Sequence, residues 1–163
     1  TKYVFEDIIR LGCKFAILGS GEKIYEDFFS EMHYRYPDRV GLTIGFVPEL
    51  SKKIYAGADM FLMPSQSEPC GLAQMIALRY GTIPIVRETG GLRDSIHDAG
   101  DKNGNGFTFK SYNAHDMLDA VVRARAYYDD KMKWGRLVNT ALKQDFSWTK
   151  SAKDYIALYN DIH

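Results

Sequence analysis

Short apolar runs alternate along this chain with longer segments in which apolar residues recur every three or four positions. A short apolar run is typical of a buried strand, and the longer period is that of an amphipathic helix. The predicted strands are residues 15–18, 42–46, 60–63, 83–86 and 107–109. The predicted helices are residues 3–11, 22–36, 71–80, 116–128, 131–142 and 148–159, with another helix opening at Pro48 and a short one from Leu92.

The order of these segments predicts an α/β fold in which parallel strands are joined by crossover helices. We expect one domain over residues 1–163, a Rossmann-like, doubly wound parallel sheet followed by C-terminal helices. Pro37 ends the helix 22–36, and Gly81 is expected to take the left-handed cap after residues 71–80. Such sheets bind their ligands at the carboxyl ends of the strands.

Composition excludes several classes of function. Of 163 residues, 45% are hydrophobic and 26% charged, which is ordinary globular usage. The 21 Lys and Arg residues balance the 21 Asp and Glu residues, so we expect no binding to nucleic acid or to an anionic membrane. No apolar run approaches the roughly 20 residues that span a bilayer, and no signal peptide opens the chain, so a cytoplasmic protein is expected. Cys13, Cys70 and the histidines are too scattered to indicate a metal site.

Three loops that follow predicted strands are rich in residues able to hold an anion: 19–21, 65–71 and 89–91. Glycine allows backbone N–H groups to approach a ligand, and a helix starting at Gly71 directs its positive dipole end to the same rim. A diphosphate suits that arrangement. Tight turns also use glycine without binding anything, so the plain turn remains an alternative for Gly19 and Gly21. Glu68, a carboxylate beside this helix start, is either a site residue or a solvated surface charge.

Three motifs closely resemble the sugar-nucleotide site of bacterial glycogen synthases and plant starch synthases. They are Ser-Gln-Ser-Glu-Pro-Cys-Gly-Leu-Ala-Gln at 65–74, Tyr-Gly-Thr-Ile-Pro-Ile-Val-Arg at 80–87, and Thr-Gly-Gly-Leu-Arg-Asp-Ser at 89–95. The resemblance implies the C-terminal half of a two-domain glucosyltransferase. Such an enzyme moves glucose from ADP-glucose to the non-reducing end of an α-1,4-glucan, with retention and without a cofactor or metal.

Carried over by position, the resemblance places Glu68 against the glucose ring as the catalytic residue. It implies that Phe46 stacks on adenine, although a Phe at a strand end is more often a core residue. Arg87, just past a strand, is either a cation of the site or an outward surface residue. The other nucleotide-sugar-binding positions that it implies are Cys70, Gly71, Leu72, Thr89, Gly90 and Gly91, and the glycine loop after the first strand adds Gly19 and Gly21 as candidates.

The chain departs from the family pattern at two positions and lacks the upstream part. Ile76 stands where related glycosyltransferases often carry a ribose-binding Glu, and Ala73 where many members have Thr. The chain begins at Thr1 and runs straight into a helix, whereas the phosphate-neutralising Arg and Lys and the N-terminal domain would lie upstream. We therefore expect a piece of a longer enzyme that binds ADP weakly and is inactive alone. Its terminal helix, 147–163, is expected to pack towards the missing N-terminal domain.

Two alternatives remain open: a related enzyme that uses a uridine-diphosphate sugar, and a non-catalytic nucleotide-binding module. A Rossmann dehydrogenase does not fit, because Gly19-Ser-Gly21 is followed by Glu22-Lys-Ile24 and lacks the third glycine of that fingerprint.

Overall fold

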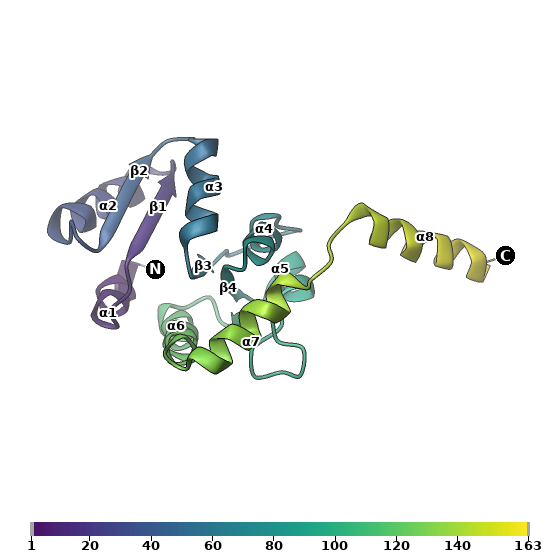
Figure 1. The fold of residues 1–163 in the computed structure, drawn as a ribbon. Helices are drawn as coiled ribbons and strands as arrows, with labels where there is room; N and C mark the ends of the chain where they lie inside the picture. Colours follow the sequence, from purple (N-terminus) through teal and green to yellow (C-terminus); the bar gives the residue numbers. More distant parts are fainter. Residues whose placement is uncertain (1, 163) are drawn as a thin grey trace.

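The computed structural model describes residues 2–162, in which parallel strands alternate with helices (Figure 1). The strands are β1 (Phe15–Gly19), β2 (Val40–Ile44), β3 (Met60–Met63), β4 (Ile83–Arg87) and β5 (Phe107–Phe109). The helices are the 3-10 turn η1 (Lys2–Val4), α1 (Phe5–Arg10), α2 (Lys23–Arg35), α3 (Pro48–Gly57), α4 (Ala73–Tyr80), α5 (Gly90–Ser95), α6 (Ala114–Asp129), α7 (Lys131–Leu142) and α8 (Trp148–Ile162). The predicted α/β class is confirmed.

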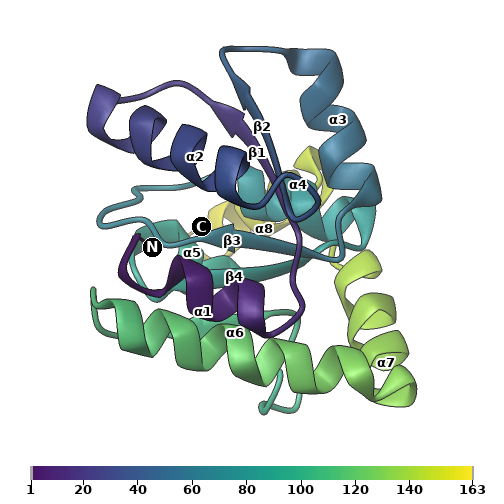
Figure 2. The same ribbon diagram turned by 90° about the vertical axis from the view of Figure 1, so that its left-hand side faces the viewer.

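The strands form two parallel sheets, whereas one continuous sheet was expected. β1 pairs with β2, with Ile17 opposite Leu42. In the second sheet β4 lies between β3 and β5, and Ile85 lies opposite both Leu62 and Phe107. Within residues 2–162 no ladder joins β1 to β3, and Figure 2 shows the first pair inclined to the second sheet. The two sheets are held together by α3, which contacts β1 and also α4.

Two apolar cores correspond to the two sheets. The larger core surrounds β4 and β5, which are almost entirely buried because α6 packs across them. In the smaller core Phe5 stacks on Phe15, with ring centroids 4.2 Å apart, and Met32 and Val40 are buried beside them. Helix α1 joins the two cores, since Phe5 belongs to one and Ile8 to the other. Each fully buried side chain of this size stabilises the fold by about 1.5–3 kcal/mol.

Glycine conformation sets both ends of α4. Gly81 has φ +77° and takes the left-handed cap after Tyr80, as predicted. Gly71 has φ +68°, which a right-handed helix does not accommodate, so α4 begins at Ala73, two residues later than the sequence pattern indicated. The residues before Ala73 therefore form a loop at the carboxyl rim of β3.

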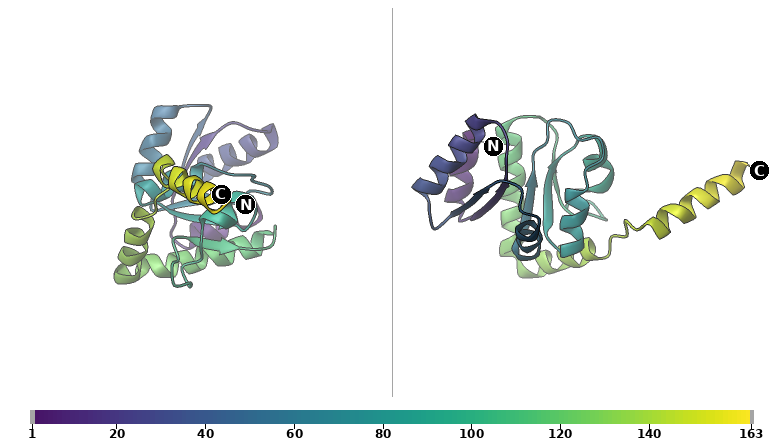
Figure 3. Two further views of the ribbon diagram at one scale, coloured as in Figure 1. Left: turned by 90° about the vertical axis from the view of Figure 1, so that its right-hand side faces the viewer. Right: turned by 90° about the horizontal axis from the view of Figure 1, so that it is seen from above.

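Helix α8 extends away from the rest of the molecule (Figures 1 and 3). The predicted terminal helix is present as Trp148–Ile162, and residue 163 lies outside the described residues. None of its described residues is buried, although Trp148, Tyr155 and Tyr159 are large and apolar.

Candidate functional site

The loop after β3 packs directly on the loop after β4 at the carboxyl rim of the second sheet. The backbone N–H of Gly91 donates to the carbonyl oxygens of Glu68, at 3.1 Å, and of Pro69, at 3.3 Å. A Cβ on Gly90 would lie 1.9 Å from the Glu68 carbonyl oxygen, and a Cβ on Gly91 would lie 2.1 Å from that of Cys70. Neither position has room for a side chain. The structure therefore joins two of the three loops that the sequence pattern indicated.

Gln74, to which the sequence pattern assigned no role, links the loop after β3 to α5 through hydrogen bonds. Its side chain is fully buried, and Nε2 donates to the carbonyl oxygen of Gly71 at 2.8 Å and to Oγ of Ser95 at 3.1 Å. Ser95 in turn donates to the carbonyl oxygen of Gly91 at 2.6 Å. These bonds tie the start of α4 to α5. The only sequence signal for this role was a Gln at the second position of an apolar helix. A buried amide side chain at such a position needs hydrogen-bond partners.

Arg87, the last residue of β4, donates hydrogen bonds to the same loop. Its Nε donates to the carbonyl oxygen of Ser65 at 3.0 Å, and its guanidinium also donates to the carbonyl oxygen of Gln66. A further N–H reaches the carbonyl oxygen of Lys110 at 3.4 Å. The sequence pattern left Arg87 open between a site cation and an outward surface residue. The structure gives it a third role, fixing the loop that carries Glu68.

Unpaired backbone donors lie at the N-terminus of α4. Among residues 2–162, the N–H groups of Cys70, Gly71 and Leu72 have no hydrogen-bond partner, and no side chain caps the helix. The positive end of the helix dipole points to the same place. Free N–H groups at a helix N-terminus form an anion-binding position, particularly for phosphate groups.

The facing loop offers fewer donors than the glycine pattern suggested. The N–H of Thr89 donates to the carbonyl oxygen of Arg87 at 2.9 Å, and that of Gly91 is bonded to Glu68. Gly90 is the residue of this loop whose N–H has no partner within the described chain. Gly91 therefore allows the two loops to pack closely, and Gly90 provides a backbone N–H group that is free to bind a ligand.

Glu68 lies at this rim, as the sequence pattern predicted. The residue is half-buried, and within residues 2–162 its carboxylate makes no hydrogen bond or ion pair. A carboxylate accepts hydrogen bonds at both oxygens, so this one is free to accept them from the hydroxyl groups of a ligand.

A second opening lies at the carboxyl ends of β1 and β2. It is a cavity of about 230 Å³ whose lining includes Gly19, Gly21 and Ile44. No residue that lines it comes from the loops at 68–72 or 89–91. The N–H of Gly21 is bonded to Oε1 of Glu26 at 2.9 Å, an arrangement that favours the plain turn at Gly21.

Phe46 follows Ile44, a residue that lines this opening, by two positions, and its side chain projects into solvent. β2 ends at Ile44, two residues earlier than predicted, because Gly45 takes φ +136° and turns the chain. The side chain of Phe46 is 90% exposed, so the alternative of a core residue is wrong. An aromatic face left open to solvent is available for stacking on a flat ligand.

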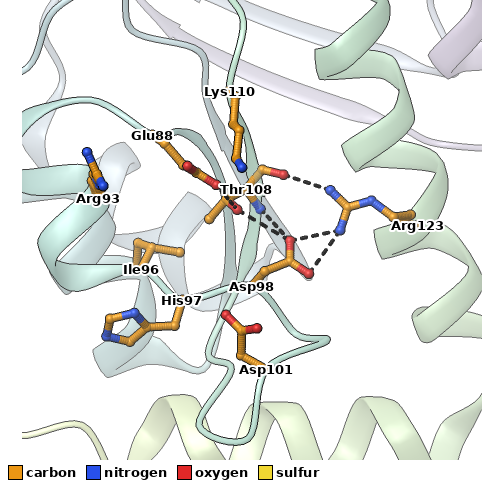
Figure 4. Close-up of a pocket in the computed structure, with 9 residues that line it drawn as sticks. All are labelled: Glu88, Arg93, Ile96, His97, Asp98, Asp101, Thr108, Lys110 and Arg123. Atoms are coloured by element: carbon orange, nitrogen blue, oxygen red, sulfur yellow. Dashed lines mark hydrogen bonds and ion pairs between the residues drawn. The ribbon is translucent and has the colours of Figure 1, made fainter.

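A polar cavity of about 460 Å³ opens beside α5 and β5 (Figure 4). Thr108 donates through its hydroxyl to Oε1 of Glu88 at 2.8 Å, and Arg123 donates to Oδ2 of Asp98 at 2.8 Å. Burial alone would raise the pKa of Asp98. Hydrogen bonds from Arg123 and from the backbone N–H groups of Thr108 and Gly100 outweigh this effect and hold the pKa below its ordinary value. None of the predicted site residues lines this cavity. The ion pair between Arg123 and Asp98 fixes the loop that follows α5.

Parallel strands whose carboxyl rim carries glycine loops and an uncapped helix N-terminus define a nucleotide-binding α/β domain. The chain belongs to the family of glycosyl transferases group 1, whose model matches residues 5–136. It is 53% identical to a glycogen synthase of Anoxybacillus flavithermus, over 99% of this chain and 34% of the relative. It is 50% identical to a glycogen synthase of Desulforudis audaxviator, over 97% of this chain and 32% of the relative. The chain thus spans about a third of the length of the curated relatives it matches.

Solved structures agree with this assignment. The catalytic domain of starch synthase IV from Arabidopsis thaliana, bound to ADP and acarbose, has a TM-score of 0.85 and 38% identity, covering 98% of this chain and 34% of that one. A sucrose-phosphate synthase from Thermosynechococcus elongatus, with a TM-score of 0.61 and 21% identity over 89% of this chain and 37% of that one, shows the fold alone. The predicted resemblance to glycogen and starch synthases and the Rossmann-like fold class are confirmed.

No helix within residues 2–162 is long and apolar enough to cross a membrane. The same residues contain no group of three or more His, Cys, Asp or Glu side chains placed to hold a metal ion.

Proposed function

We propose that this chain is the donor-binding domain of a retaining glucosyltransferase that moves glucose from ADP-glucose to the non-reducing end of an α-1,4-glucan. One observation carries the proposal. The loop 68–72 rests on Gly90 and Gly91 and presents unpaired N–H groups at the start of α4. Relatives named glycogen synthase match almost the whole chain, which supports the assignment.

Departure of ADP leaves negative charge on the diphosphate and positive charge on the sugar ring. The N–H groups of Cys70, Gly71 and Leu72 stabilise the leaving diphosphate, and Gly90 donates from the facing loop. Because these groups are fixed before the reaction, they need not reorganise as the charge develops. The donor therefore supplies the reacting group and the chain supplies dipoles, so the reaction needs no cofactor. The basic side chains that neutralise the leaving diphosphate come from the rest of the parent enzyme.

Glu68 accepts hydrogen bonds from the glucose hydroxyls and stabilises the positive charge near C1. Its half-buried, unpaired carboxylate supports this role. Gln74 and Arg87 act through the loop as positioning residues, because they bond its carbonyl groups and leave its N–H groups free.

Adenine stacks on Phe46, whose ring is 90% exposed. A purine covers more of such a ring than a pyrimidine does, which favours an adenosine donor over a uridine donor. The starch synthase IV domain was solved with ADP bound, which supports the same choice.

Transfer to the glucan requires the remainder of the parent, and α8 docks against it. Trp148, Tyr155, Ile156 and Tyr159 recur at helical spacing and are all at least 59% exposed, so they form one apolar face. In the parent, Tyr159→Asp is expected to lower the melting temperature, whereas Lys153→Asp, a control in the same helix, is expected to leave it unchanged. Equal melting temperatures for both variants would contradict the docking.

We place the parent in the cytoplasm. Cys13 and Cys70 are free thiols, and Cys70 is exposed, so the chain suits a reducing compartment.

The donor is tested by calorimetric titration of ADP and UDP into the parent and into this chain. We expect the parent to bind ADP more tightly than UDP by up to about tenfold, the limit set by losing a whole stacking contact of about 1.4 kcal/mol. The chain alone is expected to bind ADP weakly and to transfer no measurable glucose. Tighter binding of UDP would favour the uridine alternative, and glucose incorporation by the chain alone would refute the requirement for the remainder.

The role of Glu68 is tested by Glu68→Ala in the parent. Turnover is expected to fall by about 10²–10⁴-fold with an unchanged melting temperature, because the carboxylate acts on the reacting sugar. Glu49→Ala removes an exposed carboxylate from α3 and serves as the matched control. A near-normal rate for Glu68→Ala would remove Glu68 from the catalytic role, and equal losses of rate in the two variants would do the same.

A further inference from the structure

The two residues before the loop 89–91 send their side chains to opposite faces of the sheet. Arg87 ends β4, and the N–H of Glu88 extends the ladder by donating to the carbonyl oxygen of Phe109 at 2.9 Å. Successive side chains along a strand point to opposite faces. Arg87 therefore reaches the loop at 65–66, whereas Glu88 reaches the polar cavity beside β5 (Figure 4).

The hydroxyl group of Thr108 donates to Glu88. Its Oγ1 lies 2.8 Å from Oε1 of Glu88 and 3.4 Å from Oδ2 of Asp98. A hydroxyl has one proton to donate and an ionised carboxylate only accepts, so the proton goes to the nearer oxygen, which belongs to Glu88. Within residues 2–162 this is the one hydrogen bond or ion pair of the Glu88 side chain.

Thr108 is itself held firmly in β5. The residue is buried, its N–H donates to Oδ2 of Asp98 at 2.9 Å, and its carbonyl oxygen accepts from Arg123 at 2.7 Å. Arg123 is also paired with Asp98 at 2.8 Å, which closes the network drawn in Figure 4. Glu88 is therefore bonded to a donor that has little freedom to move.

The far end of the same segment is held from the same side. The side chain of Asn105 is fully buried, and its Nδ2 donates to the carbonyl oxygen of Ser95 at 3.0 Å. Its Oδ1 accepts from the N–H of His97 at 2.8 Å. Residues 105–108 thus hold the loop 89–91 and α5 at both of their ends.

Gly90, which has the free N–H of this loop, lies between these two attachments. Gly91, after it, is held by the bond from its N–H to Glu68. Glu88, before it, is held by its N–H bond to Phe109 and by the bond from Thr108 to its side chain. The direction of the Gly90 N–H depends on both neighbours, because only two residues separate it from the end of the β4–β5 ladder.

We propose that Thr108 and Glu88 are positioning residues of the donor site, whose mutual hydrogen bond directs the Gly90 N–H towards the diphosphate. Neither side chain touches the donor. The inference rests on the proposed function, because it takes the diphosphate to lie at Gly90. It adds a contribution from β5 and α6, which contain none of the predicted site residues.

Thr108→Val in the parent is the direct test. Val keeps the branched shape and both backbone bonds of residue 108, so the variant removes only the hydroxyl. We expect kcat/KM for ADP-glucose to fall about three- to tenfold, the worth of one hydrogen bond, with the KM for glucan unchanged. Thr108→Ser, which retains the hydroxyl, is expected to stay within about twofold of the original enzyme. Thr140→Val removes a hydroxyl that bonds within α7 and is the matched control.

A double-mutant cycle separates positioning from a general loss of stability. When Glu88 is already Ala, Thr108→Val has no bond left to remove, so it is expected to change kcat/KM by less than about twofold. An equal loss in both backgrounds would overturn the proposal, and so would a Thr108→Ser enzyme as slow as Thr108→Val. Both results would assign the effect to packing.

Amide hydrogen exchange of the ligand-free parent tests the same bond without a donor. Thr108→Val is expected to speed exchange of the Glu88 and Gly91 amides about three- to tenfold and to leave the amide of Leu137, in α7, unchanged. Unchanged exchange at Glu88 and Gly91 would overturn the proposal, as would faster exchange with unaltered kcat/KM. An original parent that fails to bind ADP would refute the proposed function. An original parent that binds ADP, with a Thr108→Val variant that behaves identically, would refute only this inference.

Discussion

Gly91→Ala tests the joint between the two loops on which the candidate site rests. The new Cβ would lie 2.1 Å from the carbonyl oxygen of Cys70 and 2.7 Å from its carbonyl carbon and Cα, all of them backbone atoms. The loop must therefore move by about 1 Å, and such overpacking costs about 1–3 kcal/mol. That movement also weakens the bond from the Gly91 N–H to Glu68, worth about 1 kcal/mol. We expect a loss of about 2–4 kcal/mol in the free energy of unfolding.

Urea denaturation of the chain measures this loss, and Gly135→Ala in α7 is the matched control. A Cβ on Gly135 meets no atom within 4 Å, and Ala is the better helix former, so the control is expected to gain about 0.5–1 kcal/mol. ADP binding should fall with Gly91→Ala and stay unchanged in the control. A Gly91→Ala protein within about 0.5 kcal/mol of the original would refute the close packing, because most surface substitutions stay inside that range.

Three further substitutions test other parts of the site. Asp98 has a lowered pKa, so its contribution to stability is present above the unfolded pKa of about 3.9 and is lost as the pH falls through the lower folded value. Asp98→Asn should cost about 1 kcal/mol at pH 7, after allowance for partial exposure, and progressively less below pH 4 in urea titrations; a constant difference would contradict this. Arg87→Met should weaken ADP binding by the parent about tenfold, through loss of the carbonyl contacts at 65 and 66, whereas the exposed control Arg79→Met should not. Phe46→Ala should reduce the preference of the parent for ADP over UDP without lowering its melting temperature, since the ring is 90% exposed; an unchanged preference would exclude stacking.

Local patterns were sufficient to predict the type and order of the elements. The apolar run at 60–63 and the helix at 131–142 have the bounds that the pattern gave, because both signals are local in the sequence, although β3 is only half-buried. Glycine at 81 predicted the left-handed cap for a similar reason, since few other residues take that conformation without strain.

Contacts between distant residues could not be predicted in the same way. Gln74 bonds Ser95, 21 positions away, and Arg87 bonds Ser65, 22 positions away. Neither pairing leaves a periodic trace in the sequence. The N–H of Gly91 shows a second limit of prediction from sequence patterns. A glycine-rich loop indicates close approach, but it does not indicate whether the neighbour is a ligand or, as here, the carbonyl oxygen of Glu68.

The two halves of the candidate donor site depend on different parts of the protein. Every contact that shapes the diphosphate half joins residues between 65 and 123, so that half is formed by the second sheet and the helices packed on it. The proposed nucleobase half, around Gly19 and Phe46, belongs to the first sheet, which α3 and α1 connect to the second without a ladder within the described residues. Within the described residues, the relative position of the two halves is therefore set by helix packing alone. Discrimination between ADP and UDP depends on that position, whereas attraction of a diphosphate does not. We therefore expect nucleotide selectivity to be weaker in this chain than in the parent, even where the phosphate contacts are the same.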